Sequence, residues 1–123
     1  MRVIRAVRYR RTGPAAEVLE ITELPLPEPS VGEVCVRLHA SGVNPHDTKG
    51  RSGWAGGEMP PSGIVPHSDG AGVIEAAGAE VSQARIGARV YVLGAKAQGT
   101  AAEYVCLPSE QALDLPDTLS FAE

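Results

Sequence analysis

The side chains that can do acid–base or hydrogen-bonding chemistry gather in two short segments, Gly42–Gly53 and Pro66–Gly72. The first segment places Asn44, His46 and Asp47 almost side by side. An imidazole can act as a general acid near neutral pH, and the amide of an asparagine can donate a hydrogen bond to a developing oxyanion. These residue types therefore indicate a polar site that stabilises charge or moves a proton.

A strand and a short helix must hold these side chains in place. Glu33–Ser41 alternates apolar and polar residues, which predicts a half-buried strand. After it, Asn44 is a helix-capping residue type, and Pro45 is favoured at the first helical position. We therefore expect a helical turn that starts at Asn44 and runs towards Gly50, beside the mouth of the strand. A capping role alone is the alternative explanation for Asn44.

The rest of the sequence favours short strands joined by turns, because 14 glycines and 10 prolines are spread along 123 residues. Gly53–Gly63 is predicted to be a surface loop that carries Trp54 and can act as a lid. A single β-rich domain over residues 1–123, a barrel or a sandwich, is the expected fold. Further strands are predicted over Val3–Arg10, Val18–Leu24, Gly70–Ala77, Arg89–Leu93 and Ala101–Leu107.

Charge and hydropathy exclude several classes of partner. The net charge of −4 disfavours binding to nucleic acid or to an anionic membrane. The five arginines within Arg2–Arg11 are interpreted as the solvent face of an edge strand. No apolar run approaches the ~20 residues of a membrane span, and the first residues lack the apolar core of a signal peptide. We expect a cytoplasmic protein.

The two cysteines, Cys35 and Cys106, lie 71 positions apart in strand-like contexts and are interpreted as packing residues. A metal pair of Cys35 and His39 is excluded on an unbent strand. Four residues of extended chain separate their Cα atoms by about 13 Å, whereas zinc ligands lie within about 2–2.3 Å of the metal.

A series of motifs, taken in their order and spacing, resembles the zinc-independent quinone oxidoreductase branch of the medium-chain dehydrogenase/reductase superfamily. The resemblance implies a GroES-like, partly open β-barrel, mainly β with short helices, as an N-terminal catalytic domain. It also implies a following Rossmann domain that holds NAD(P)H. The motifs are Ala6–Tyr9, Gly13–Leu19, Gly32–Arg37, Gly42–Gly53, Pro66–Glu75, Gly87–Val90 and Gly99–Val105.

The same resemblance indicates hydride chemistry without zinc. Zinc-dependent members place a cysteine ligand at the position of Asn44 and a histidine ligand at the position of Ser68. Amide and hydroxyl oxygens are poor replacements for thiolate and imidazole on zinc, so we expect no metal. Conjugated acceptors such as quinones and enones need less polarisation than a plain ketone, because the developing charge is spread over the conjugated system.

The resemblance also implies roles for individual residues. Asn44 and Asp47 match polar residues that line the nicotinamide end of the cleft, so both are expected to contact the cofactor. His46 stands where zinc-dependent relatives carry a proton-relay hydroxyl. These three are the predicted catalytic residues, with an exposed side chain at the helix end as the alternative for His46.

Three further residues are predicted to contact the substrate. Arg51 matches an Arg-Ser-Gly motif of the relatives, where a structural ion pair is an equally good explanation. Lys49 stands where close relatives often carry tyrosine, and Trp54 lies on the predicted lid loop.

No Gly-x-Gly-x-x-Gly motif follows a predicted strand, so the dinucleotide must bind mainly outside residues 1–123. The Ser-x-x-Glu sequence at Ser120–Glu123 is a capping box that normally announces a helix. We therefore expect the catalytic part of a longer NADPH-dependent enzyme, with weak cofactor affinity and little activity of its own. The incomplete barrel is expected to expose an apolar edge and to favour a homo-oligomer.

Two alternatives remain open at this point. The chain can be a non-catalytic GroES-like module that serves in binding or oligomerisation. It can also be a metal-dependent alcohol dehydrogenase with an atypical site, in which His46 and His67 bind the metal together with Asp47 or Asp69.

Overall fold

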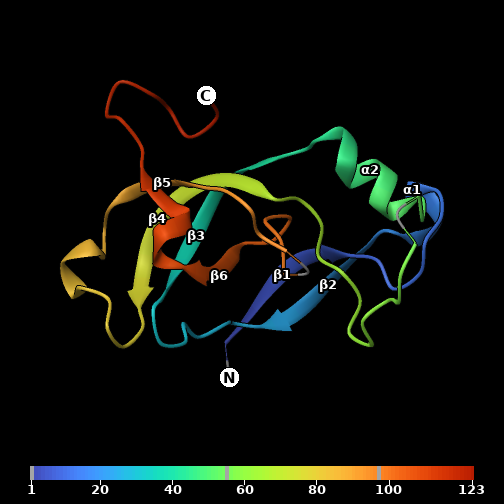
Figure 1. Cartoon of the computed structure of the whole chain (residues 1–123), viewed down its shortest axis with the longest axis horizontal. Coiled ribbons are helices and arrows are strands. Elements are labelled where there is room, and N and C mark those ends of the chain that lie inside the picture. The colour runs from blue at the N-terminus through green and yellow to red at the C-terminus, as the bar shows by residue number, and fades with distance from the viewer. Residues whose placement is uncertain (1, 55, 97) are drawn as a thin grey trace.

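The computed structural model describes residues 2–54, 56–96 and 98–123, and most of its regular structure is β-strand (Figure 1). The two α-helices are short: α1 covers Ala15–Val18 and α2 covers Pro45–Arg51. Single 3-10 turns lie at Gln83–Arg85 and Ser109–Gln111. The strands are β1 (Val3–Arg8), β2 (Glu20–Pro25), β3 (Glu33–Gly42), β4 (Asp69–Ala77), β5 (Arg89–Val92), β6 (Tyr104–Pro108) and β7 (Ala112–Asp114).

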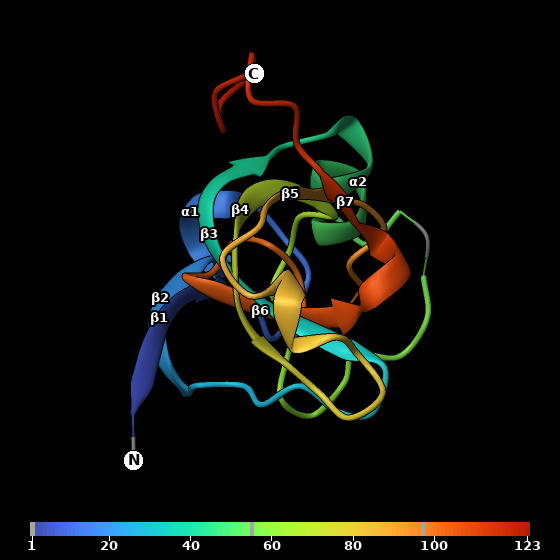
Figure 2. The same cartoon turned by 90° about the vertical axis from the view of Figure 1, so that its left-hand side faces the viewer.

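The strands form a two-stranded hairpin and a five-stranded sheet. β1 pairs with β2, and the larger sheet has the order β6-β3-β4-β5-β7, with antiparallel neighbours throughout. The larger sheet curls without closing on itself, and the hairpin lies to one side of it (Figure 2). This arrangement confirms the predicted GroES-like, partly open barrel.

The hairpin is joined to the larger sheet through β1. The N–H of Val7 donates to the carbonyl of Ala101, and the N–H of Glu103 donates to the carbonyl of Arg5. The main core lies within the curled sheet and consists mostly of β-branched residues, which suit pleated, buried strands. Its fully buried members include Val34, Val36, Ile74, Val90 and Val92.

Several predicted boundaries differ from the structure. Val18 belongs to α1 instead of opening the second strand, and the strand predicted from Ala101 begins at Tyr104. β7 was not predicted, because its three residues are too few to show an alternating pattern. Gly53–Gly63 contains neither helix nor strand among its described residues, as expected of a loop, and Ala55 lies outside the described residues.

The close pairing of β3 with β4 depends on two glycines of β4. A Cβ atom at Gly72 would overlap the backbone carbonyl of Arg37, and one at Gly70 would lie 2.7 Å from the carbonyl oxygen of Ala40. Close approach of the two backbones therefore explains why glycine stands at both positions.

The substitution Gly72→Ala is expected to lower the free energy of unfolding by about 2–3 kcal/mol, because β3 and β4 must move apart. Urea unfolding followed by circular dichroism measures this change. Gly50→Ala is the matched control. Its Cβ would meet only the Tyr9 hydroxyl, 3.8 Å away, and alanine in a helix is favoured by about 0.5–1 kcal/mol. Equal effects of the two substitutions would contradict the packing argument.

Candidate functional site

The N-terminus of α2 is closed by a reciprocal pair of hydrogen bonds. The backbone N–H of Asn44 donates to Oδ2 of Asp47 over 2.7 Å, and the N–H of Asp47 donates to the carbonyl of Asn44 over 2.9 Å. Asp47 is the third residue of the helix, and its side chain is only 8% exposed. The predicted helix start is therefore confirmed, and both residues have a structural duty there.

The side chain of Asn44 reaches a second element. Its Nδ2 donates to Oδ2 of Asp69, the first residue of β4, over 2.8 Å. A carboxylate only accepts hydrogen bonds, so this contact fixes which end of the amide faces Asp69. Nδ2 carries a second hydrogen that this bond does not use. Asp69 therefore holds the amide in one orientation and leaves that N–H for a further acceptor.

His46 lies between the helix and the loop before β4. Its Nε2 is 3.0 Å from Oγ of Ser68 and 3.2 Å from Oδ1 of Asp47. Because the carboxylate can only accept, its contact requires a hydrogen on Nε2, which the Ser68 oxygen can share as a second acceptor. The imidazole is 63% exposed, so it can exchange protons with solvent.

A second polar chain joins His67 and Asp69 to two residues that were not predicted from the sequence, Ser41 and Thr100. Oγ of Ser41 lies 2.8 Å from Nδ1 of His67 and 2.9 Å from Oγ1 of Thr100, which donates to the carbonyl of Asp69 over 2.7 Å. His67 has a φ of 78°, in the left-handed region. Nothing in the local sequence signals these contacts, because Ser41 and Thr100 are 59 positions apart.

A cleft of about 270 Å3 opens beside His46 and Asp47. Tyr9 lies in its wall, and burial, followed by the nearby Asp47 carboxylate, raises the pKa of its phenol. Tyr9 was missed because it lies in the N-terminal segment, far from both motifs in the sequence. The cleft is lined by Tyr9, His46, Asp47, Gly50, Ile64, Pro66, His67, Ser68, Ala95 and Lys96.

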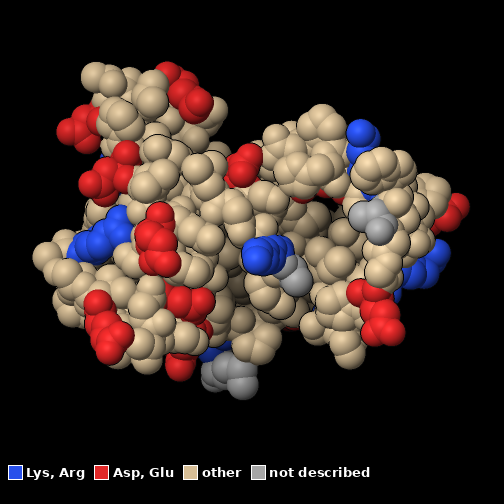
Figure 3. Space-filling view, in the orientation of Figure 1, with Lys and Arg blue, Asp and Glu red and all other residues tan. Residues whose placement is uncertain are grey.

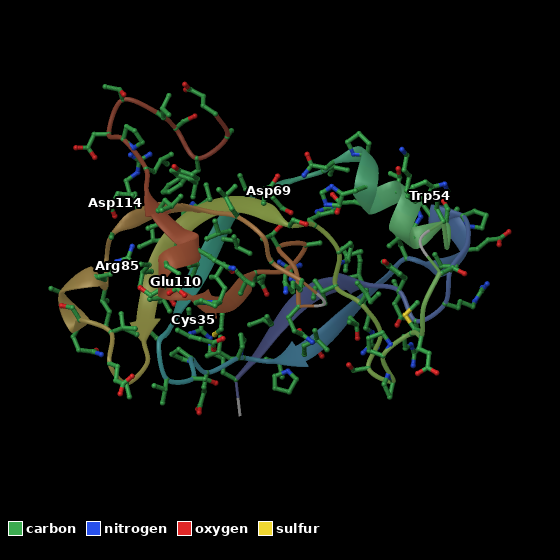
Figure 4. All side chains as sticks on the ribbon, viewed as in Figure 1. Cys35, Trp54, Asp69, Arg85, Glu110 and Asp114 are labelled. Atoms are coloured by element: carbon green, nitrogen blue, oxygen red, sulfur yellow. The ribbon has the colours of Figure 1, made fainter. Side chains whose placement is uncertain are left out.

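The three residues predicted to contact the substrate do not line this cleft. Nζ of Lys49 lies 5.3 Å from the centre of the Trp54 ring, a cation–π contact on the outside of the molecule. Nε of Arg51 donates to the carbonyl of Gly13 over 3.3 Å. Figure 4 shows Trp54 at the far end of α2 from Asp69. Their contact with a substrate stays a prediction.

The atypical metal site is not formed. Among residues 2–54, 56–96 and 98–123, no three side chains of histidine, cysteine, aspartate or glutamate come together in a way that could hold an ion. His67 contacts Ser41, whereas His46 contacts Ser68 and Asp47. Among the described contacts, the two histidine side chains therefore share no direct partner.

Two larger cavities lie away from His46. One of about 510 Å3 includes Asp69 in its wall and extends to the segment after β7. The other, of about 520 Å3, lies between the hairpin and the start of β6. On the face drawn in Figure 3, acidic side chains gather at the end formed by β4, β5 and the C-terminal segment. None of the described helices has the length and apolar character needed to cross a membrane.

Residues 30–117 match the alcohol dehydrogenase GroES-like domain family. The chain belongs to this family. The match covers β3, α2 and β4 and therefore the whole Asn44–Asp69 arrangement.

Similar proteins within this oxidoreductase family support the predicted branch. The chain is 35% identical over 123 residues to the quinone oxidoreductase of Mus musculus, which covers 99% of the chain and 36% of that protein. It is 38% identical over 97 residues to the synaptic vesicle membrane protein VAT-1 homolog of Rattus norvegicus, covering 79% of the chain and 23% of that protein. The chain thus spans about a third or less of the length of these relatives.

Solved structures show the same fold. A structure described as an NADPH:quinone reductase from Bacillus thuringiensis superposes with a TM-score of 0.89 at 26% identity, over 98% of the chain and 36% of that structure. Mycobacterial Rv1454c, solved in complex with NADPH, gives a TM-score of 0.80 at 31% identity, over 96% of the chain and 34% of that structure.

The substitution Asp47→Ala is expected to lower the free energy of unfolding by about 1–2 kcal/mol, because it removes the acceptor that caps α2. Thermal or urea unfolding measures the change. Asp117→Ala is the matched control, since its side chain is fully exposed and joins only a weak ion pair with Arg89. An effect no larger than that of the control would show that the cap contributes nothing.

Proposed function

We propose that the chain is the catalytic domain of an NAD(P)H-dependent oxidoreductase that reduces quinones or α,β-unsaturated carbonyl compounds by hydride transfer. The observation that carries the proposal is the Asn44 amide, which Asp69 orients at the start of α2, two residues before His46 of the cleft. The names of the relatives support it, because quinone oxidoreductases recur among them and one similar structure contains NADPH.

Asn44 is proposed to stabilise the charge that develops on the acceptor. Asn44 and Ser68 carry amide and hydroxyl groups, which are poor zinc ligands. Hydrogen bonds are therefore proposed to polarise the carbonyl group of the acceptor. The second N–H of the Asn44 amide is the donor. Because Asp69 already fixes the amide, no side-chain reorientation is needed when charge appears, and a preorganised donor stabilises a transition state most effectively.

His46 is proposed to supply the proton that completes the reduction. Hydride addition to a conjugated acceptor leaves an anion that must be protonated at carbon or oxygen. The imidazole lies in the cleft wall, is oriented by Ser68 and Asp47, and is open to solvent for reprotonation. Asp47 thus serves as a positioning residue for His46 as well as a cap.

The cofactor supplies the hydride when bound. The polar groups at the start of α2 fit the carboxamide of a nicotinamide, since Oδ1 of Asn44 and the carboxylate of Asp47 can accept from its nitrogen, while the second N–H of Asn44 stays with the acceptor. The described residues contain no Gly-rich strand-turn-helix segment to cradle the phosphates. Most of the binding energy for the nucleotide is therefore proposed to come from outside residues 1–123.

A chimera tests the proposed function. Residues 1–123 replace the matching segment of the mouse quinone oxidoreductase, and NADPH oxidation is followed at 340 nm with quinones and enones as acceptors. Turnover with conjugated acceptors, and none with saturated ketones, is expected. A folded chimera that binds NADPH and reduces no conjugated carbonyl would refute the proposal.

Within the chimera, Asn44→Leu is expected to lower kcat roughly 100-fold, the usual cost of removing one oxyanion donor. Asp117→Asn, on the exposed C-terminal segment, is the control and leaves kcat unchanged. Circular dichroism of both variants separates loss of chemistry from loss of the fold. If Asn44→Leu raises only KM for the acceptor, the amide binds the substrate without stabilising the transition state.

A second candidate function is self-association into a homo-oligomer. The edge of the larger sheet that β7 forms favours it. In the part of the chain that the structure describes, β7 pairs with β5 alone, and Tyr91, Leu93 and Leu113 beside this edge are partly exposed. An open edge with apolar neighbours is a template for pairing with a second copy.

Light scattering after size exclusion is expected to show a dimer or larger species of the 123-residue chain, and Leu113→Lys is expected to shift it to monomer. Glu110→Lys, just before β7, is the control for the added charge. A monomer at concentrations of about 100 μM, the range in which exposed edges associate, would eliminate this candidate.

A further inference from the structure

Cys35 and Cys106 lie directly opposite each other on β3 and β6. The backbone N–H of Leu38 donates to the carbonyl of its own partner, Glu103, over 2.8 Å, so these two residues occupy a hydrogen-bonded position. Positions alternate along an antiparallel ladder. Cys35 is three residues from Leu38 in an unbroken register, which places the cysteines at a non-hydrogen-bonded position.

The other end of the ladder gives the same alternation, because the N–H of Ser109 donates to the carbonyl of Gly32 over 2.9 Å. Cα atoms at a non-hydrogen-bonded position lie about 4.5 Å apart. A disulfide needs Cα atoms about 4.4–6.8 Å apart. The register therefore allows Cys35 and Cys106 to be bridged without a movement of the backbone.

The surroundings of the two sulfur atoms differ. Cys35 is buried, and its Sγ lies 3.8 Å from the carbonyl oxygen of Pro27. Cys106 is partly exposed and lines the cavity of about 520 Å3 between the hairpin and β6. Small molecules can therefore approach the pair through the side of Cys106. Figure 4 shows Cys35 near the start of β3, far from Asp69 and the cleft at α2.

The two thiols also affect each other. A hydrogen bond with Cys106 holds the pKa of Cys35 below its usual value, and the same contact together with burial raises the pKa of Cys106. The thiol of Cys35 is therefore the more acidic of the two. This is the combination that a reacting thiol and a resolving thiol require.

We propose that Cys35 and Cys106 form a reversible cross-strand disulfide when the protein meets an oxidant of the peroxide class. One thiolate attacks the O–O bond of hydrogen peroxide, which gives a sulfenic acid and one water after protonation. The second thiol then attacks that sulfur and releases the second water. Two thiols and one peroxide yield one disulfide and two waters, so the sulfurs lose two electrons and the peroxide gains them.

The bond would fasten β6, an edge strand, to β3 and close a long loop of chain. Because the loop spans 71 positions, cross-linking it removes much conformational freedom from the unfolded state. The melting temperature is therefore expected to rise by several degrees on oxidation and to return on treatment with dithiothreitol. The proposal is independent of the proposed reductase activity, since neither sulfur lines the cleft at His46.

The test uses the reduced 123-residue chain and one equivalent of hydrogen peroxide. Intact mass spectrometry is expected to show a monomer that has lost two hydrogens, with both thiols protected from alkylation after unfolding. The same treatment of Cys106→Ala is expected to give a sulfenic acid on Cys35, or a disulfide between two chains, and no change in melting temperature.

Exchange with oxidised glutathione gives a second measurement. The intramolecular disulfide is expected to form at least about tenfold faster in buffer than in urea, because the native register aligns the sulfurs. Equal or slower formation in buffer, two thiols that survive peroxide in the folded chain, or bridging only between chains would each overturn the proposal.

Discussion

The antiparallel pairing of β3 with β4 is the constraint on which the rest of the site depends. The register places Gly42, the last residue of β3, opposite Asp69, the first residue of β4. The segment that follows Gly42 and the segment that precedes Asp69 therefore leave the sheet at the same pair of residues. This single geometric fact brings α2 next to the loop of His67 and Ser68. Gly70 and Gly72 of β4 allow this close pairing, because side chains at these positions would push the two strands apart.

The polar residues near the Gly42–Asp69 pair form hydrogen bonds with one another. Asp47 accepts from the Asn44 backbone, Asp69 accepts from the Asn44 side chain, and Thr100 donates to the Asp69 carbonyl. No buried side-chain nitrogen or oxygen among the described residues lacks a partner. Each of these contacts fixes a side chain before any ligand binds. A site of this kind suits chemistry that relies on oriented dipoles, because such dipoles need no rearrangement as charge develops.

The sequence was sufficient to predict the elements that carry the site. β3 shows regular alternation, and the residue types at Asn44 and Pro45 mark the helix start, so local patterns determine both elements. The Asn44–Asp69 bond was not predictable from these patterns, because it depends on the register between two strands. Tyr9 and Thr100 were missed for the same reason. Both reach the site through tertiary contacts that leave no periodic trace in the sequence.

The residues predicted near the end of α2 show the limit of reasoning from neighbours in sequence. Gly50 lies one helical turn after His46 and lines the cleft, whereas Lys49 packs its ammonium group on Trp54. Lys49 was predicted to contact the substrate because it stands where close relatives often carry tyrosine, and its ammonium group lies beside Trp54, outside the lining of the cleft at His46.

The size of the cleft limits what the site at His46 can bind under the proposed function. Pockets that hold a drug-sized ligand typically have volumes of about 300–1,000 Å3, and the cleft at His46 has about 270 Å3. It can therefore accommodate a reacting ring, but not a dinucleotide as well. The chain covers 36% of the mouse quinone oxidoreductase, and the proposal assigns the remaining contacts to the other part of such a protein. On this view, Asn44 and His46 contribute the local chemistry, whereas affinity for the cofactor comes from residues beyond the barrel.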